Sequence, residues 1–196
     1  KYNIKYNMIN LNKYAGVEYY EKNIDSFKKL RSLWKITEDQ YKSELSDLTR
    51  IKSNTGGSSG AQMFYSKNKL LFIKELSNND NIQLNKIIEK YLKYMLKNKT
   101  SLLPKFYGIY KNKKTLLLVQ ENLNSFDDVS WKYDLKGSSH NRTVRKFSIK
   151  KIGKDNNFGS SSIYIKNSKK IKNQIKKDTT FLKNNLNTDL GQTWYR

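Results

Sequence analysis

The first fifty residues carry apolar side chains at helical spacing. Apolar positions recur every three or four residues over residues 17–50, which is the pattern of one buried face of an α-helix. The stripe runs through Tyr19, Ile24, Phe27, Leu30, Leu33 and Trp34. Thr37 is a residue type that caps helices, so we expect a second, short helix over residues 38–48 with Tyr41 and Leu45 on one face.

Short apolar runs separated by turn residues follow after residue 60. Residues 63–65 and 70–74 flank the turn residues Lys67 and Asn68, and this arrangement predicts a β-hairpin. Residues 82–96 return to helical spacing, with Ile87, Ile88, Tyr91, Leu92 and Met95 expected inside. The two periodicities together predict a hairpin followed by a long helix.

The second half of the chain alternates between clear and weak signals. Residues 102–110, entered through Pro104, and residues 116–119 are expected to form paired strands around a turn at residues 111–114. Beyond residue 143 we expect one short strand at residues 163–165 and a helix over residues 169–186. The element order predicts an α+β fold, an antiparallel sheet with helices packed on one side, as in a nucleotide-binding lobe.

Composition adds a partner class and excludes several kinds of site. The 196 residues suffice for one domain or two small lobes, and the net charge of +22 predicts attraction to a polyanion, either nucleic acid, an anionic membrane or nucleotide phosphates. Lysine far outnumbers arginine and asparagine is abundant, so part of this charge reflects composition alone. The absence of cysteine excludes disulfides and thiolate sites, and the single histidine, His140, excludes multi-histidine metal sites.

Terminal and apolar features give two further expectations. The absence of a continuous apolar run of about 20 residues predicts that no helix spans a membrane. Lys1 is not an initiator methionine, so we expect the chain to begin inside a longer protein.

Residues 131–142, called the charged turn below, hold the densest candidate chemistry. They combine a carboxylate, two lysines, an arginine, a glycine and two serines. Cations and hydrogen-bond donors gathered in a turn are how a site for a phosphate group is built. An ordinary polar turn would give the same letters, so the turn alone leaves both interpretations open.

A second candidate phosphate site lies earlier in the chain. Gly57, Ser58, Ser59 and Gly60 lie in a Gly/Ser-rich loop over residues 52–60, and glycines let backbone N–H groups approach phosphates closely. Lys74, fourteen positions after Gly60 on the second hairpin strand, can reach phosphate oxygens beneath such a loop. Asp80, near the start of the next helix, could pair with Lys74. A flexible linker followed by a solvated lysine remains the alternative.

The sequence resembles the phosphatidylinositol phosphate kinase family over about residues 17–189. Residues 132–139 read KYDLKGSS and reproduce the family's KYDLKGS signature, with Arg142 at the family's arginine. Residues 102–108, LLPKFYG, match the family's LLPxFYG segment, and residues 72–74 match its glycine-loop hairpin. The resemblance implies a protein-kinase-like N-lobe and the start of a C-lobe.

The resemblance also implies site roles. Lys74 and Asp189 are the implied catalytic residues, and Gly57, Ser58, Ser59, Gly60, Lys74, Val119, Asn122 and Lys136 the implied ATP contacts. Arg142 and Lys136 are implied at the lipid headgroup, with Asp80, Asp134 and Asp155 in support. ATP and Mg²⁺ are the implied cofactors, and the metal ligands are unknown. The implied domains are an extension at residues 1–16, an ATP-binding lobe at residues 17–142, and a basic insertion with the beginning of the catalytic lobe at residues 143–196.

The implied activity is transfer of the γ-phosphate of ATP to a phosphatidylinositol phosphate, with phosphatidylinositol 4-phosphate giving the 4,5-bisphosphate. Expected partners are the phosphoinositide substrate and an anionic membrane surface, on the cytoplasmic inner face, and a homodimer is compatible with the family. The family's MDYSLL motif keeps only its aspartate, Asp189, and no IID-like metal motif follows. The chain is therefore either part of a larger kinase or a catalytically degenerate kinase fold that binds anionic membranes as a scaffold. Nucleic acid is not expected, since no nucleic-acid-binding signature accompanies the basic runs.

Overall fold

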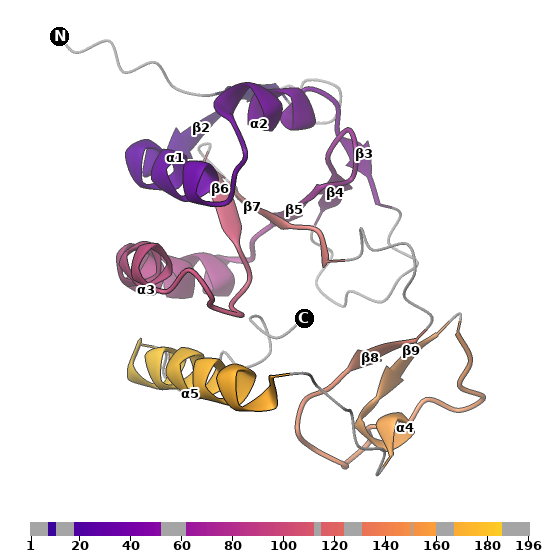
Figure 1. Ribbon diagram of the computed structural model, residues 1–196. Coiled ribbons are helices and arrows are strands. Elements are labelled where there is room, and N and C mark those ends of the chain that lie inside the picture. The colour runs from indigo at the N-terminus through magenta and orange to yellow at the C-terminus, as the bar shows by residue number, and fades with distance from the viewer. Residues whose placement is uncertain are drawn as a thin grey trace, which may run out of the picture. The chain divides into compact units, whose positions relative to one another are not determined.

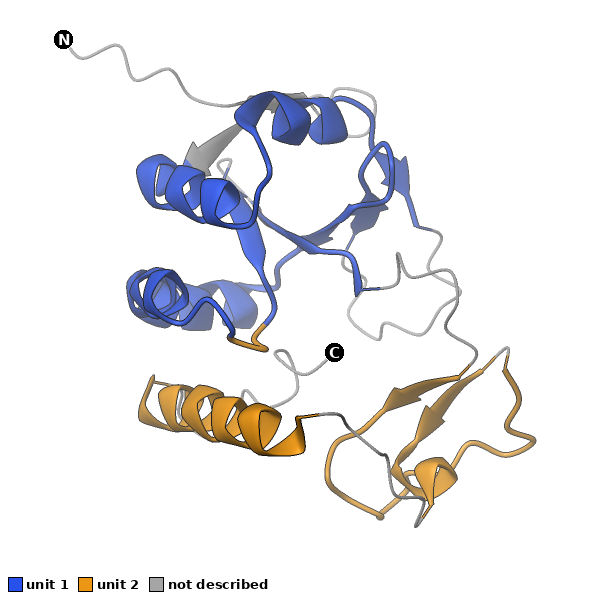
Figure 2. Ribbon diagram, viewed as in Figure 1, with its two compact units in different colours: residues 1–100, 104–125 blue, residues 101–103, 126–196 orange. Residues whose placement is uncertain are grey.

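The computed structural model describes residues 8–10, 18–51, 62–111, 115–123, 131–149, 151–159 and 167–185. The chain divides into two compact units, drawn in different colours in Figure 2. The first unit comprises residues 1–100 and 104–125, and the second comprises residues 101–103 and 126–196. Each unit is described by itself below.

The first unit is built on an antiparallel sheet of seven described strands (Figure 1). Their order across the sheet is β1-β2-β6-β7-β5-β4-β3, and every neighbouring pair is antiparallel. The strands are β1 (Met8–Asn10), β2 (Glu18–Lys22), β3 (Thr49–Arg50), β4 (Met63–Tyr65), β5 (Leu71–Glu75), β6 (Phe106–Lys111) and β7 (Leu116–Glu121). The predicted hairpin is confirmed as β4 and β5, and the predicted strand pair as β6 and β7.

One face of the sheet packs against α2 (Glu38–Leu45). Ile73 of β5 lies opposite Val119 of β7, so their side chains leave the sheet on the same side. Both belong to one buried cluster with Tyr41 and Leu45 of α2. Thr37 caps α2 as predicted, because its side chain accepts from the Gln40 amide while the Gln40 side chain accepts from the Thr37 amide.

The opposite face packs against α3 (Asn78–Lys97), which confirms the predicted long helix. Phe106 lies opposite Gln120, and Gln120 lies opposite Phe72, so Phe106 points away from the α2 side. Tyr91 of α3 contacts Phe106 with 4.6 Å between ring centroids. Helices therefore cover both faces, and the prediction of helices on one side only is wrong in this respect. Residues 116–119 of β7 are apolar and buried on both faces of the sheet, so each face needs a cover.

The beginning of the predicted first helix is a strand instead. Residues Glu18–Lys22 form β2, which pairs with β6, and α1 runs only over Ile24–Leu33. Asn23 separates the two with a left-handed backbone (φ 54°), which ends the strand before the helix begins. Tyr19 lies five positions before Ile24, which is not helical spacing, and pairing with the distant strand β6 decides the conformation of this segment.

A buried arginine ties the first two helices to the sheet. Arg31 of α1 is fully buried and donates from Nε and Nη2 to the two carboxylate oxygens of Glu38, at 2.6 and 2.9 Å. Its Nη1 donates to the Tyr107 carbonyl at 2.6 Å, and its guanidinium lies 4.2 Å from the centre of the Tyr41 ring. One charged side chain thus joins α1, α2 and the start of β6.

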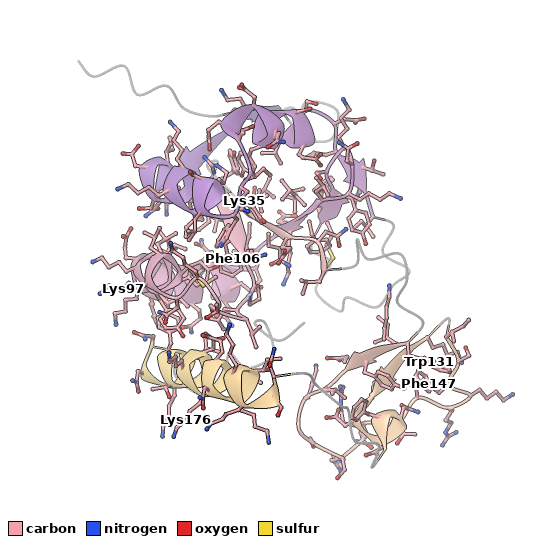
Figure 3. The ribbon with its side chains drawn as sticks, viewed as in Figure 1. Lys35, Lys97, Phe106, Trp131, Phe147 and Lys176 are labelled. Atoms are coloured by element: carbon pink, nitrogen blue, oxygen red, sulfur yellow. The ribbon has the colours of Figure 1, made fainter. Side chains whose placement is uncertain are left out.

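The second unit contains a two-stranded parallel sheet and two helices. Its described elements are β8 (Lys132–Asp134), β9 (Ile152–Lys154), α4 (Asp155–Phe158) and α5 (Ser168–Asn185). Phe147 packs between Trp131 and Tyr133, at 5.0 and 5.4 Å between ring centroids, and Figure 3 shows it beside Trp131. Gly153 is needed beneath these rings, since a Cβ there would lie 2.7 Å from Phe147 and Tyr133.

Outcomes differ for the predictions in this unit. The predicted final helix is confirmed as α5, whereas β9 and α4 were not predicted. The predicted strand at residues 163–165 lies outside the described residues. The charged turn lies in the second compact unit, where it is bonded to residues 152–156, and the predicted domain boundaries stay predictions. No helix among the described residues is long and apolar enough to cross a membrane.

Candidate functional site

Lys74 and Asp80 form an ion pair on the α3 side of the sheet. Lys74 lies next to Ile73 in β5, so its side chain leaves on the face opposite α2. Its Nζ lies 3.5 Å from Oδ2 of Asp80, and the two side chains are 19% and 21% exposed. A lysine held by a carboxylate at a partly open face has its position set while its charge remains available to a phosphate.

The start of α3 explains how the shorter carboxylate reaches the lysine. The Ser77 hydroxyl accepts from the Asp80 amide at 3.1 Å and caps the helix, so Asp80 lies in its first turn, directly after β5 ends. Farther along α3, the Tyr91 hydroxyl donates to the Pro104 carbonyl at 2.5 Å and accepts from the Phe106 amide at 3.0 Å. Burial raises the pKa of this hydroxyl, so it stays protonated and able to donate. The helix carrying Asp80 is therefore held to the sheet beyond its first turn.

Val119 and Asn122, the residues implied as the adenine contact, have side chains buried in the protein interior. Val119 is fully buried in the cluster with α2, on the face opposite Lys74. Asn122 is 3% exposed, and its side-chain amide donates to the Lys69 carbonyl at 2.6 Å while its backbone amide donates to the Leu70 carbonyl at 3.0 Å. The structure thus uses the Asn122 donors to hold the β4–β5 turn, and a nucleotide contact by either residue stays a prediction.

A buried glutamate holds the other side of the same turn. Glu44 of α2 is 4% exposed and accepts from the Ser66 hydroxyl at 2.5 Å and from the Asn68 side-chain amide at 2.7 Å. Its backbone carbonyl also accepts from the Lys67 amide. The turn between β4 and β5 is therefore bonded to α2 on one side and to Asn122 on the other. Sequence reasoning missed this role of Glu44, whose only signal was a carboxylate at a helix position next to apolar Leu45.

The charged turn is organised around Asp155, the first residue of α4. Its Oδ1 accepts from the backbone amides of Lys136 and Gly137 at 2.9 and 2.8 Å, and its Oδ2 accepts from Arg142 Nε at 2.7 Å. Gly137 has a left-handed backbone (φ 69°), which suits glycine and turns both amides toward one acceptor. The predicted cluster of amide donors therefore exists, and it holds a carboxylate of the protein.

Arg142 is bound by two carboxylates at once. Besides Asp155, it donates to the Asp134 carbonyl, and its Nη2 lies 3.2 Å from Asp134 Oδ2. The hydrogen bond from Arg142 holds the pKa of Asp155 well below its usual range, and the bond to Asp155 in turn raises the pKa of Arg142. Lys136 has a 28% exposed side chain whose Nζ lies 3.9 Å from Asp134 Oδ2. Asp134, Lys136, Arg142 and Asp155 therefore form one locally neutral group.

Several implied site residues lie outside the described part of the chain. These are Gly57, Ser58, Ser59, Gly60 and Asp189. Within the described ranges, no group of three or more histidine, cysteine, aspartate or glutamate residues could hold a metal ion. The described site chemistry thus consists of the Lys74–Asp80 pair in the first unit and the neutral charged group in the second.

Comparisons with known proteins agree on one family. The family model described as Phosphatidylinositol-4-phosphate 5-Kinase matches residues 42–189. The type-2 alpha phosphatidylinositol 5-phosphate 4-kinase of Mus musculus is 31% identical over 169 residues, which is 80% of this chain and 42% of that protein. The phosphatidylinositol 4-phosphate 5-kinase of Plasmodium falciparum is 29% identical over 163 residues, 74% of this chain and 9% of that protein. The type-1 alpha phosphatidylinositol 4-phosphate 5-kinase of Rattus norvegicus is 31% identical over 122 residues, 60% of this chain and 22% of that protein. The chain thus spans less than half the length of these relatives.

Proposed function

Because the chain belongs to the phosphatidylinositol phosphate kinase family, we propose that it is the nucleotide-binding part of a lipid kinase. The reaction is transfer of the γ-phosphate of ATP to a hydroxyl of a phosphatidylinositol phosphate. The observation that carries the proposal is the Lys74–Asp80 ion pair, formed on the α3 side of the sheet by two partly exposed residues whose roles the resemblance implies.

Lys74 would neutralise the phosphates of ATP, with Asp80 holding its ammonium group in place. The loop with Gly57, Ser58, Ser59 and Gly60 would cover those phosphates through backbone N–H groups. Val119 lies in β7 and Asn122 directly follows this strand, against which adenine would lie. Since the Val119 side chain and the Asn122 donors are engaged elsewhere, we assign that contact to backbone carbonyl groups or neighbouring side chains.

The charged turn would face the lipid headgroup and the nucleotide phosphates through Lys136, with Arg142 and Asp134 in the same turn. Asp189 would orient the attacking hydroxyl. Among the described residues, no group of three or more histidine, cysteine, aspartate or glutamate side chains could hold a metal ion, so no Mg²⁺ ligand is assigned there.

The substrate that we propose is phosphatidylinositol 4-phosphate, with the 4,5-bisphosphate as product. The relatives named above include both 4-kinases and 5-kinases, so the choice of the 5-hydroxyl as the phosphorylated position is a separate part of the proposal. The partner surface would be an anionic leaflet on the cytoplasmic side, attracting the net charge of +22 with about 1 kcal/mol for each basic residue near the lipid. A homodimer is compatible with this arrangement.

Labelled phosphate transfer tests the proposal. Full-length protein is incubated with radiolabelled ATP, Mg²⁺ and vesicles that contain mixed phosphoinositides, and the lipid products are separated and identified. We expect a labelled bisphosphate that is lost in Lys74→Met and retained in Lys67→Met, a matched change at the exposed hairpin turn. Vesicle binding with no labelled lipid in the wild-type protein would reject the kinase in favour of a membrane-binding scaffold.

A further inference from the structure

We propose that the three polar residues Asp155, Asn156 and Asn157 are positioning residues for the charged turn, and that Arg142 acts through them and not by contact with the substrate. These three residues, called the DNN bracket below, open α4 and bond to the backbone from Lys136 to Val144. The inference rests on the proposed function, because the turn it shapes is the one assigned to the phosphate groups of the substrates.

Asp155 holds the first half of the turn. It accepts three hydrogen bonds, from the amides of Lys136 and Gly137 and from Arg142 Nε, at 2.7–2.9 Å. Its side chain is 15% exposed, and its bonds to the Lys136 and Gly137 amides lie at the surface of the unit. Both carboxylate oxygens act as acceptors toward donors that cannot rotate freely, and the Lys136 backbone is therefore tied to the start of α4.

Asn156 holds the middle of the loop. Its side-chain amide donates to the Ser139 carbonyl and to the Thr143 hydroxyl, both at 2.9 Å. Its backbone amide donates to the Arg142 carbonyl at 3.0 Å. The chain between Gly137 and Thr143 would otherwise have few partners, because it forms no helix or strand.

Asn157 closes the far end of the loop. Its side-chain oxygen accepts from the Val144 amide at 2.7 Å and from the Lys154 amide at 3.1 Å, and its side-chain nitrogen donates to the Val144 carbonyl at 3.0 Å. The two bonds to Val144 use its amide and its carbonyl, as a neighbouring strand residue would. The side chains of Asp155, Asn156 and Asn157 therefore supply the backbone hydrogen-bond partners that this loop would otherwise find in a sheet.

The surrounding charges separate the roles of Lys136 and Arg142. Arg142 is 12% exposed and lies against Asp134 and Asp155, so an approaching phosphate meets two carboxylates close to the guanidinium. Lys136 is more exposed, and its nearest carboxylate lies 3.9 Å away. The DNN bracket therefore fixes the backbone of Lys136, and the ammonium group of Lys136 is more open to an approaching phosphate than the Arg142 guanidinium is.

Asp155→Asn is the sharpest perturbation, because it keeps the shape of the side chain. An amide offers one acceptor oxygen, so its NH₂ group must face either the two backbone amides or the guanidinium. The matched control is Asp178→Asn in α5. Asp178 is 4% exposed and accepts from the Leu102 amide and the Ser101 hydroxyl, so its loss disturbs the same unit away from the turn.

The experiment combines kinetics with hydrogen exchange in full-length protein. We expect Asp155→Asn to lower kcat/KM for the lipid about a hundredfold, the loss associated with a displacement of about 1 Å. Arg142→Gln should cost about as much, and the double variant no more than either single variant, since both break one structural pair. Amide exchange in residues 132–142 should accelerate in both variants and stay unchanged in Asp178→Asn.

Two results would overturn the inference. One is a double variant in which kcat/KM falls by the product of the two single losses, as direct headgroup contact by Arg142 requires. The other is unchanged exchange in residues 132–142 after Asp155→Asn. If the wild-type protein is inactive, the proposed function is rejected. Amide exchange in residues 132–142 then decides by itself whether the DNN bracket positions the charged turn.

Discussion

Replacing Asp80 by asparagine should impair catalysis more than it impairs stability. At 3.5 Å and an effective dielectric constant of about 20, the attraction between Lys74 and Asp80 is about 5 kcal/mol before desolvation. Ion pairs with this degree of water access retain about 1 kcal/mol after desolvation and side-chain entropy are subtracted. Asp80 also lies in the first turn of α3, where losing a negative charge costs about 0.3–1 kcal/mol. We therefore expect the free energy of unfolding to fall by about 1–2 kcal/mol.

The effect on phosphate transfer follows from the position of Lys74. Without its carboxylate, the ammonium group can leave the place where we propose that it meets the phosphates of ATP, and a displacement of about 1 Å would lower kcat/KM about a hundredfold. Asp80→Glu restores the charge with one additional methylene, and we expect most of the activity to return. Initial rates of labelled phosphate transfer and urea unfolding measure the two quantities on the same preparations.

Asp39→Asn is the matched control for the helix terminus. Asp39 lies exposed in the first turn of α2, so its change reports the loss of a charge at a helix start without affecting the Lys74–Asp80 pair. Wild-type kcat/KM in Asp80→Asn would refute the reasoning, and so would an equal loss in Asp39→Asn.

Two further predictions concern the Arg31–Glu38 and Arg142–Asp155 ion pairs. Arg31→Met should lower the free energy of unfolding by about 3 kcal/mol, because it removes the donor that Arg31 provides to Glu38 and to the Tyr107 carbonyl. Urea unfolding measures this change. A loss below about 1 kcal/mol would contradict the stabilising role given to Arg31. Arg142 lowers the pKa of Asp155, so the pair stabilises the fold above the ordinary aspartate pKa of about 3.9, and this contribution disappears as the pH falls through the folded-state value. The melting temperature should therefore fall more between pH 5 and about pH 3 in the wild type than in Asp155→Asn, and parallel curves would argue against the pair.

Elements with local signals were predictable from the sequence. The Thr37 cap and the turn residues of the β4–β5 hairpin act within a few residues, so the pattern indicated α2 and the hairpin correctly. Asp80 follows Lys74 by six positions across the junction between β5 and α3, and their pairing was predictable for the same reason.

Features that depend on distant partners were not predictable. β2 is a strand because β6 lies beside it, which its own residues do not show. The role of Asp155 depends on a loop about 20 residues earlier, and the pattern of asparagines after a short basic strand does not show which backbone they will contact. The side-chain directions of Val119 and Asn122 depend on register, which a run of apolar residues leaves open.

The strand order of the sheet has a consequence for synthesis on the ribosome. β2 pairs with β6, and Lys22 lies opposite Ile109, so the N-terminal strands must wait until roughly 90 further residues have been made. At about 5–20 residues per second, this delay is about 5–18 s. During that time β1 and β2 have open edges that can pair with another nascent chain, which makes this end of the molecule the stretch that a chaperone would need to shield.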